Sequence, residues 1–181
     1  MHLRTLSILA ATMAAGLAAA PAQAADATHC APGETDMFSC KLKKGKIVSL
    51  CASADLGKQV GYLQYRFGPA SKIEFAYPKE PKGAPQLRLT RSADKSATYD
   101  DLTFVVGHFT YELTSFRQLQ KKNASGLDTP ESSDTLSVRD DRKSMREGDI
   151  VFNDDCAALG KPLSVGDIAA KTGAAVEKGG F

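Results

Sequence analysis

Four cysteines are the residues of this chain whose type and spacing point most clearly to chemistry: Cys30, Cys40, Cys51 and Cys156. In an oxidising compartment, an even number of cysteines favours two disulfides, which can be connected in three ways. A zinc site is the alternative. It is disfavoured because the spacings contain no Cys-x-x-Cys pair and only His29 and His108 follow the N-terminal residues as further ligands. We therefore predict two disulfides, no metal and no cofactor.

Sequence motifs of the common hydrolases are absent. The chain has no Gly-x-Ser-x-Gly, no His-Glu-x-x-His and no glycine-rich phosphate loop. A catalytic triad would have to use His29, which adjoins Cys30, or His108, which follows Gly107 at an expected turn. Aspartates occur in pairs at 100–101, 140–141 and 154–155, where turn geometry and solvent already favour aspartate. We predict that the chain is not an enzyme, and a hydrolase with two facing carboxylates is the alternative.

A short stretch near residue 64 carries side chains typical of recognition surfaces. In a strand, Tyr62, Gln64 and Arg66 point to one face, while the apolar residues between them point to the other. A polar face that includes an aromatic ring is typical of a binding surface. An ordinary solvent-facing sheet surface has the same composition. We predict a ligand-binding role for these three residues against that alternative.

Lysines crowd the tip of one expected hairpin, where Lys43, Lys44 and Lys46 follow Lys41. A basic tip could bind an acidic partner, such as an anionic cell-wall polymer or the acidic cleft of an enzyme. The alternative is a solvated turn whose charges prevent edge-to-edge association of sheets.

The first 24 residues have the three parts of a secretory signal peptide. Arg4 is followed by an apolar stretch from Leu6 to Ala20 and by the small-x-small sequence Ala22-Gln23-Ala24. The apolar stretch is about 15 residues, whereas a membrane-spanning helix needs about 20. We predict cleavage after Ala24, no transmembrane segment in the mature chain, and a periplasmic or secreted bacterial protein. The loss of Arg4 from 23 basic residues leaves 22 against 21 acidic ones, so no nucleic-acid partner is expected.

The remaining sequence is dominated by the period-two alternation of half-buried strands. The pattern predicts an all-β fold, a small antiparallel barrel or sandwich, over residues 36–163, after an N-terminal segment at 25–35. A polar stretch at about 117–135 is expected to be a mobile loop. In the C-terminal tail, 164–181, a short helix is expected, with Ser164 as its cap and Gly173 near its end.

The first hairpin bears on the disulfide pairing. If Lys44 and Gly45 form a two-residue turn, Cys40 lies opposite Ser49 and Phe38 opposite Cys51. The two cysteines then lie diagonally on one face at about 7–8 Å, which is too far for a disulfide. Cys40 and Cys51 would then bond to Cys30 and Cys156, in an order that stays open. A shift of one residue in register would reverse this expectation.

Several short motifs in the region of about 30–115 resemble a group of exported proteobacterial proteins without an assigned function: Phe38-Ser39-Cys40, Ser49-Leu50-Cys51, Tyr65-Arg66-Phe67-Gly68 and Ile73-Glu74-Phe75-Ala76-Tyr77-Pro78. The aromatic-x-Cys near the start is also similar to bacterial periplasmic lysozyme inhibitors, which are small exported β-barrels. That resemblance would imply a protein that blocks a muramidase. Those inhibitors carry a Ser-Gly-x-x-Tyr loop, whereas Ser125-Gly126 is followed here by Leu, Asp and Thr. No inhibitory residue is therefore transferred.

Together these patterns predict an exported binding or inhibitory module, whose partner would be a protein such as a cell-wall hydrolase or an envelope polymer. An envelope structural protein is the alternative. The sequence leaves the oligomeric state open.

Overall fold

The computed structural model describes residues 27–57, 60–118, 122–123, 126–127, 132–143 and 149–180. The predicted signal peptide lies outside these residues, as do residues 119–121, 124–125 and 128–131 of the predicted loop at 117–135. The elements, in chain order, are β1 (Thr35–Lys41), β2 (Ile47–Ala52), β3 (Leu63–Gly68), β4 (Phe75–Tyr77), β5 (Arg88–Ala93), β6 (Ala97–Val106), β7 (Phe109–Gln118), β8 (Lys122–Asn123), β9 (Gly126–Leu127), β10 (Ser132–Asp140), β11 (Ile150–Asp155), α1 (Val165–Thr172) and β12 (Val176–Lys178). Strands β7 and β10 therefore extend into both ends of the 117–135 segment.

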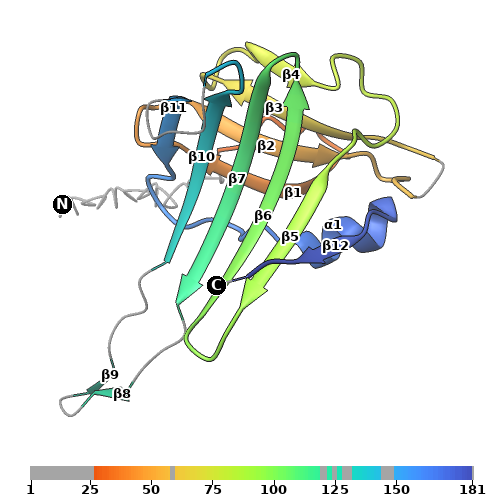
Figure 1. The fold of residues 1–181 in the computed structure, drawn as a ribbon. Coiled ribbons are helices and arrows are strands. Elements are labelled where there is room, and N and C mark those ends of the chain that lie inside the picture. Colours follow the sequence, from red (N-terminus) through yellow and green to blue (C-terminus); the bar gives the residue numbers. More distant parts are fainter. Residues whose placement is uncertain are drawn as a thin grey trace, which may run out of the picture.

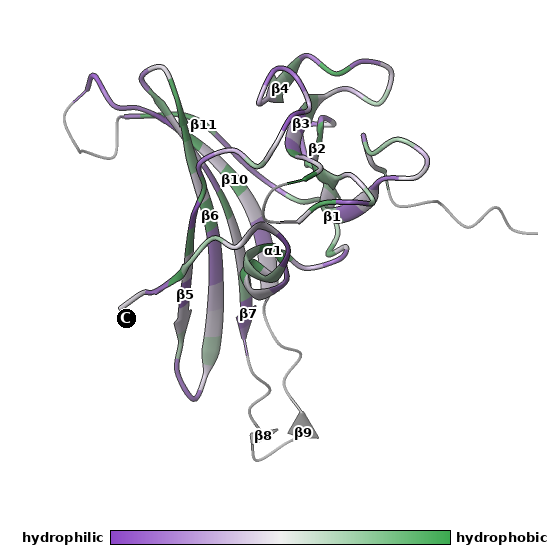
Figure 2. Ribbon diagram, turned by 90° about the vertical axis from the view of Figure 1, so that its right-hand side faces the viewer, coloured by the Kyte–Doolittle hydropathy of each residue, from purple (hydrophilic) through white to green (hydrophobic). Residues whose placement is uncertain are grey.

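Two sheets form the body of the molecule (Figure 1). The four-stranded sheet has the order β1-β2-β3-β4, and the six-stranded sheet has the order β11-β10-β7-β6-β5-β12. All pairs are antiparallel except that of β12 with β5. The sheets pack face to face and do not close on each other (Figure 2). The prediction of an all-β fold is confirmed, and of its two forms the structure is a sandwich.

The core fills the space between the sheets because alternate residues of each strand point inward. Leu102 of β6, Leu113 of β7 and Leu136 of β10 lie side by side in register and are all fully buried. Residues between them, such as Thr103 and Glu112, pair on the outer face of the six-stranded sheet. This is the alternation that the sequence predicted.

The first hairpin has a register that differs by one residue from the predicted one. Cys40 lies opposite Val48, and Ser39 opposite Ser49. The loop has three residues rather than two: the Leu42 N–H donates to the Lys46 carbonyl, and Gly45 takes a positive φ of 89°. A three-residue hairpin loop with glycine in the left-handed region is a common alternative to the two-residue turn. The predicted register was therefore wrong because the loop was one residue too short.

The register decides which cysteines can meet, because a slip of one residue moves side chains to the other face of a sheet. Cys40 belongs to the core between the sheets, whereas Cys51 pairs with Gln64 on the opposite face. The disulfides are Cys30–Cys51 and Cys40–Cys156. Cys40 and Cys51 thus bond to Cys30 and Cys156, as predicted, but they are kept apart by the sheet itself rather than by a diagonal distance.

The C-terminal helix predicted from its caps is present. Ser164 accepts a hydrogen bond from the Asp167 N–H, and Gly173 ends the helix in the left-handed conformation with φ 74°. Val165 and Ile168 bury one face of α1 against the same side of the six-stranded sheet that the four-stranded sheet covers (Figure 2). None of the helices in the described part of the chain is long and apolar enough to cross a membrane.

The inward and outward positions of β6 give a first prediction. Leu102→Ala is expected to lower the free energy of unfolding by about 2–5 kcal/mol, because it opens a cavity in the centre of the core. Val105→Ala, at an exposed position of the same strand, is the matched control and is expected to change it by less than about 0.5 kcal/mol. Denaturant unfolding of the oxidised protein measures both values. Equal losses for the two variants would contradict the assignment of faces.

Candidate functional site

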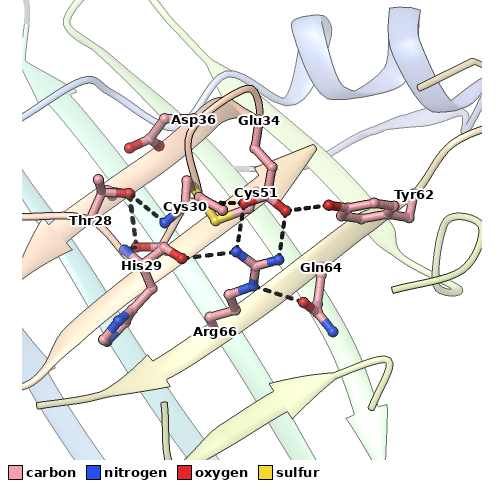
Figure 3. The surroundings of a disulfide bond; sticks show 12 residues. Thr28, His29, Cys30, Glu34, Asp36, Cys51, Tyr62, Gln64 and Arg66 are labelled. Carbon is pink, nitrogen blue, oxygen red and sulfur yellow. Dashed lines mark hydrogen bonds and ion pairs between the residues drawn. A yellow bond between two sulfur atoms is a disulfide. The ribbon is translucent and has the colours of Figure 1, made fainter. Parts of the chain in front are cut away.

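The polar residues of β3 face away from the core, as predicted, but they are covered. Residues 27–34 run across this face of the four-stranded sheet (Figure 3). Only 5% of Gln64 and 8% of Arg66 is exposed. The predicted binding face is therefore the floor beneath the N-terminal segment.

Arg66 and Glu34 form a bidentate ion pair under this segment. Arg66 Nη1 donates to Glu34 Oε2 and Nη2 donates to Oε1, each at 2.6 Å. The remaining donors of the guanidinium are directed at Gln64 Oε1, 2.7 Å from Nε, and at the His29 carbonyl, 2.8 Å from Nη1. The two charged side chains are 9% and 6% exposed. Geometry of this kind, with extra hydrogen bonds, is what a buried pair needs to offset its desolvation.

The carboxylate of Glu34 is held ionised by its neighbours. Burial alone would raise its pKa, but hydrogen bonds from Arg66, the Tyr62 hydroxyl and the Ala31 N–H outweigh that effect, and the pKa lies below its ordinary value. The same contact with Glu34 raises the pKa of Tyr62, so this phenol stays protonated and donates. All three predicted residues, Tyr62, Gln64 and Arg66, thus belong to one network centred on Glu34.

Two further contacts fix the segment at its other end. The Cys30–Cys51 disulfide joins it covalently to β2, and the Ser49 hydroxyl accepts the His29 N–H at 2.9 Å while bonding to Ser39. We name this whole arrangement the N-terminal latch: Thr28, His29, Cys30, Glu34, Ser39, Ser49, Cys51, Tyr62, Gln64 and Arg66. A ligand would reach Gln64 and Arg66 only if the segment moved away, whereas Tyr62 is half-buried.

The latch does not fit a metal ion. Cys30, Glu34 and Cys51 bring potential ligand atoms within 4.8 Å of one another. Both sulfurs are consumed by the disulfide, and Glu34 neutralises Arg66. A thiolate is the metal-binding form of cysteine, so this set offers one free carboxylate at most.

The lysines of the hairpin tip are tied to neighbouring elements. Lys43 pairs with Asp155 at 2.8 Å, Lys44 donates its ammonium to the Asn153 carbonyl at 2.8 Å, and Lys46 pairs with Glu74. The tip is therefore docked on β11 and on the segment before β4 rather than extended as a free finger.

An apolar cleft opens between the two sheets, at the end of the sandwich where Lys46 lies. It has a volume of about 370 Å³, and its lining combines six aromatic rings with three aliphatic side chains and Lys46. The aromatic residues are Tyr65, Phe67, Phe75, Phe109, Tyr111 and Phe152, and the aliphatic ones are Leu136, Val138 and Val151. They come from β3, β4, β7, β10 and β11. This volume lies within the range of small-molecule sites.

One wall of the cleft is a stack of rings that spans both sheets. Phe75 of β4 stacks on Tyr111 of β7 with centroids 5.1 Å apart and planes 7° from parallel, and Tyr111 stacks on Phe104 at 5.0 Å. Phe104 in turn stacks on Tyr77 at 4.9 Å. Offset stacks of this kind are favourable and restrict ring movement, so the wall is preformed.

The far end of this stack lines a second, larger hollow of about 970 Å³. Its surroundings are mixed and include Gln86, Arg88 and Arg139. The smaller cleft is the stronger candidate because its lining is apolar except for one side chain.

Sequence reasoning missed both Glu34 and the cleft. Alternation had already assigned Tyr65 and Phe67 to the apolar face of their strand, which is correct. Periodicity cannot distinguish a filled core from an open cleft, however, because that depends on how five strands distant in sequence converge.

The aspartate pairs do not form facing carboxylates. Asp100 contacts Arg91 on the inner side of the six-stranded sheet, while Asp101 accepts a hydrogen bond from Thr114 on the outer side. Asp154 accepts the Lys44 N–H, and Asp155 pairs with Lys43. Adjacent strand residues point to opposite faces, so the two carboxylates of these pairs do not face each other. In the third pair, Asp140 accepts a hydrogen bond from Arg142, and Asp141 accepts one from the Thr110 hydroxyl.

No family model, no curated protein and no solved structure matches the chain. The resemblances drawn from its motifs therefore stay predictions.

The latch gives a second prediction. Glu34→Gln is expected to lower the free energy of unfolding by about 3–5 kcal/mol at neutral pH, because it leaves Arg66 buried without a counter-charge. Glu80→Gln, at an exposed glutamate, is the control and should change it little. Since the pKa of Glu34 is lowered in the folded state, its stabilisation is present at neutral pH and is lost progressively below about pH 4.3, the ordinary glutamate value.

Denaturant unfolding between pH 3 and pH 7 tests both parts. The difference between wild type and Glu34→Gln should be largest at neutral pH and shrink on acidification. A difference that is small at neutral pH, or that does not change with pH, would contradict the structural role of the pair.

Proposed function

We propose that the chain is an exported, non-enzymatic binding module that holds an apolar group of its ligand in the cleft between the two sheets. One observation carries this proposal: the cleft is open although nine of the ten residues lining it are aromatic or aliphatic. Apolar surface left in contact with water costs about 25 cal/mol per Å² relative to burial. A concave apolar surface of this kind is typical of ligand sites.

The contacts of the other candidate surfaces support this choice. The polar face of β3 is filled by Glu34 and its neighbours, and the hairpin lysines are engaged by β11 and Glu74. The lining of the smaller cleft, in contrast, is open.

The chemistry of the lining favours binding over catalysis. Its ionisable groups are Lys46, Tyr65 and Tyr111. Burial raises the pKa of both phenols, so they stay neutral at physiological pH. General acid–base catalysis needs a group whose pKa lies near the working pH, and the two phenols do not meet this condition.

Export is supported by two features that point the same way. Residues 1–24 have the pattern of a signal peptide, and both disulfides are of a kind that persists in oxidising compartments. The ligand is therefore one met in the periplasm or outside the cell.

A variant that fills the cleft tests the proposal. Val151 lines the cleft and is 49% exposed, whereas its neighbour Ile150 is 43% exposed and does not line it. Val151→Trp should occupy the cleft and weaken binding of the neutral fluorescent probe N-phenylnaphthylamine by at least about tenfold, a change of about 1.4 kcal/mol. Ile150→Trp is the matched control and should leave binding unchanged.

The measurement is fluorescence titration of the oxidised protein with the probe. Failure of the wild type to bind it, or equal binding by both variants, would refute the assignment of the cleft.

A further inference from the structure

We infer that the ligand is an amphiphile with an apolar chain and a single anionic head group, and that Lys46 binds this head group at the mouth of the cleft. The inference rests on the proposed function, because it names the class of ligand for the same site.

Lys46 is the one charged side chain among the described residues that line the cleft. Its ammonium lies 5.9 Å from the centroid of Phe67, whose ring belongs to the apolar lining. About a third of the side chain is exposed. The ammonium therefore stands where the apolar lining meets solvent, which is where the head group of an inserted amphiphile would lie.

A second ammonium, that of Lys44, lies over another ring of the lining, although Lys44 itself does not line the cleft. Lys44 Nζ is 5.2 Å from the centroid of Phe152, another ring of the lining. Its hydrogen-bond acceptor is the neutral carbonyl of Asn153. Two ammonium groups thus lie over rings of the lining, and both belong to the hairpin that joins β1 and β2.

Three carboxylates lie next to the lysines of this hairpin. Asp155 pairs with Lys43, and Asp154 accepts the backbone N–H of Lys44. Glu74 is the carboxylate that pairs with Lys46 itself. Glu74 therefore balances the charge of Lys46 at the mouth of the cleft.

The pair between Lys46 and Glu74 is one that a ligand can replace. Its side chains are 35% and 40% exposed, and pairs this exposed contribute about 0–1 kcal/mol. Glu74 lies in the short segment between β3 and β4 and can turn to solvent at little cost. An anionic head group can take the place of Glu74 at the Lys46 ammonium. Burial of its chain in the cleft adds binding energy that Glu74 does not have.

A cationic head group is the opposite case. It would have to lie beside the ammonium of Lys46. Glu74, the nearby carboxylate that could attract it, already pairs with that ammonium. A neutral head group would gain nothing from the lysines. The charge at the mouth therefore discriminates among ligands with the same chain.

Three compounds with an identical chain test this: dodecanoate and dodecyltrimethylammonium below their micelle concentrations, and dodecanol below its solubility limit. They are titrated into the oxidised protein carrying N-phenylnaphthylamine, and displacement of the probe gives each affinity. Dodecanoate is expected to bind about two- to fivefold more tightly than dodecanol at pH 7, the ratio that an ion pair of about 0.5–1 kcal/mol supplies.

Charge variants assign that preference to Lys46. Lys46→Gln should remove the preference for dodecanoate and leave dodecanol binding unchanged, which also shows that the cleft is intact. Glu74→Gln should strengthen dodecanoate binding and leave dodecanol unchanged. Lys95→Gln, at an exposed lysine in the turn between β5 and β6, is the control and should behave as the wild type.

Equal affinity for dodecanoate and dodecanol, or a preference for the cationic compound, would overturn the anionic head group while leaving the cleft as a binding site. A preference for dodecanoate that survives in Lys46→Gln would overturn the role of Lys46. If the probe binds but none of the three compounds displaces it, the inference of an amphiphilic ligand fails while the cleft remains a binding site. If the probe does not bind, the proposed function fails as well.

Discussion

The buried charge of Arg66 is the constraint on which one whole face of the molecule depends. A guanidinium does not lose its proton in proteins, so its burial at this position requires a matching anion and hydrogen-bond acceptors. Glu34 supplies the anion with two contacts of 2.6 Å, and it can do so because residues 27–34 are fixed over the four-stranded sheet. The Cys30–Cys51 disulfide keeps that segment in place. The face that looked like a recognition surface is thereby closed.

A single strand, β3, serves both the closed face and the open one. Its polar residues, Gln64 and Arg66, build the latch, while Tyr65 and Phe67 between them line the cleft. The alternation of a strand makes this division possible, because neighbouring side chains never share a face. Loosening the latch would therefore disturb the backbone that positions two rings of the cleft.

Much of the fold was predictable because it follows from local rules. The alternation placed residues 63–67 correctly, and Ser164 and Gly173 marked the ends of α1. The register of the first hairpin was not predictable, since Gly45 suits loops of two or three residues equally well. The partner of Arg66 was missed because Glu34 is 32 residues away in a segment without a pattern. The cleft was missed because its lining converges from five strands, and no sequence period records that convergence.

In the proposed function, a ligand enters between the sheets and leaves the latch closed. The most direct measurement is the set of methyl resonances in NMR spectra of the oxidised protein during titration with dodecanoate. We expect the methyl resonances of Leu136, Val138 and Val151, which line the cleft, to shift when the ligand is added. The methyl groups of Val165 and Ile168, on the buried face of α1, should not shift. Shifts confined to the methyl groups of Ala27, Thr28 and Ala31 in the N-terminal segment, or no shifts at all, would contradict the proposed function.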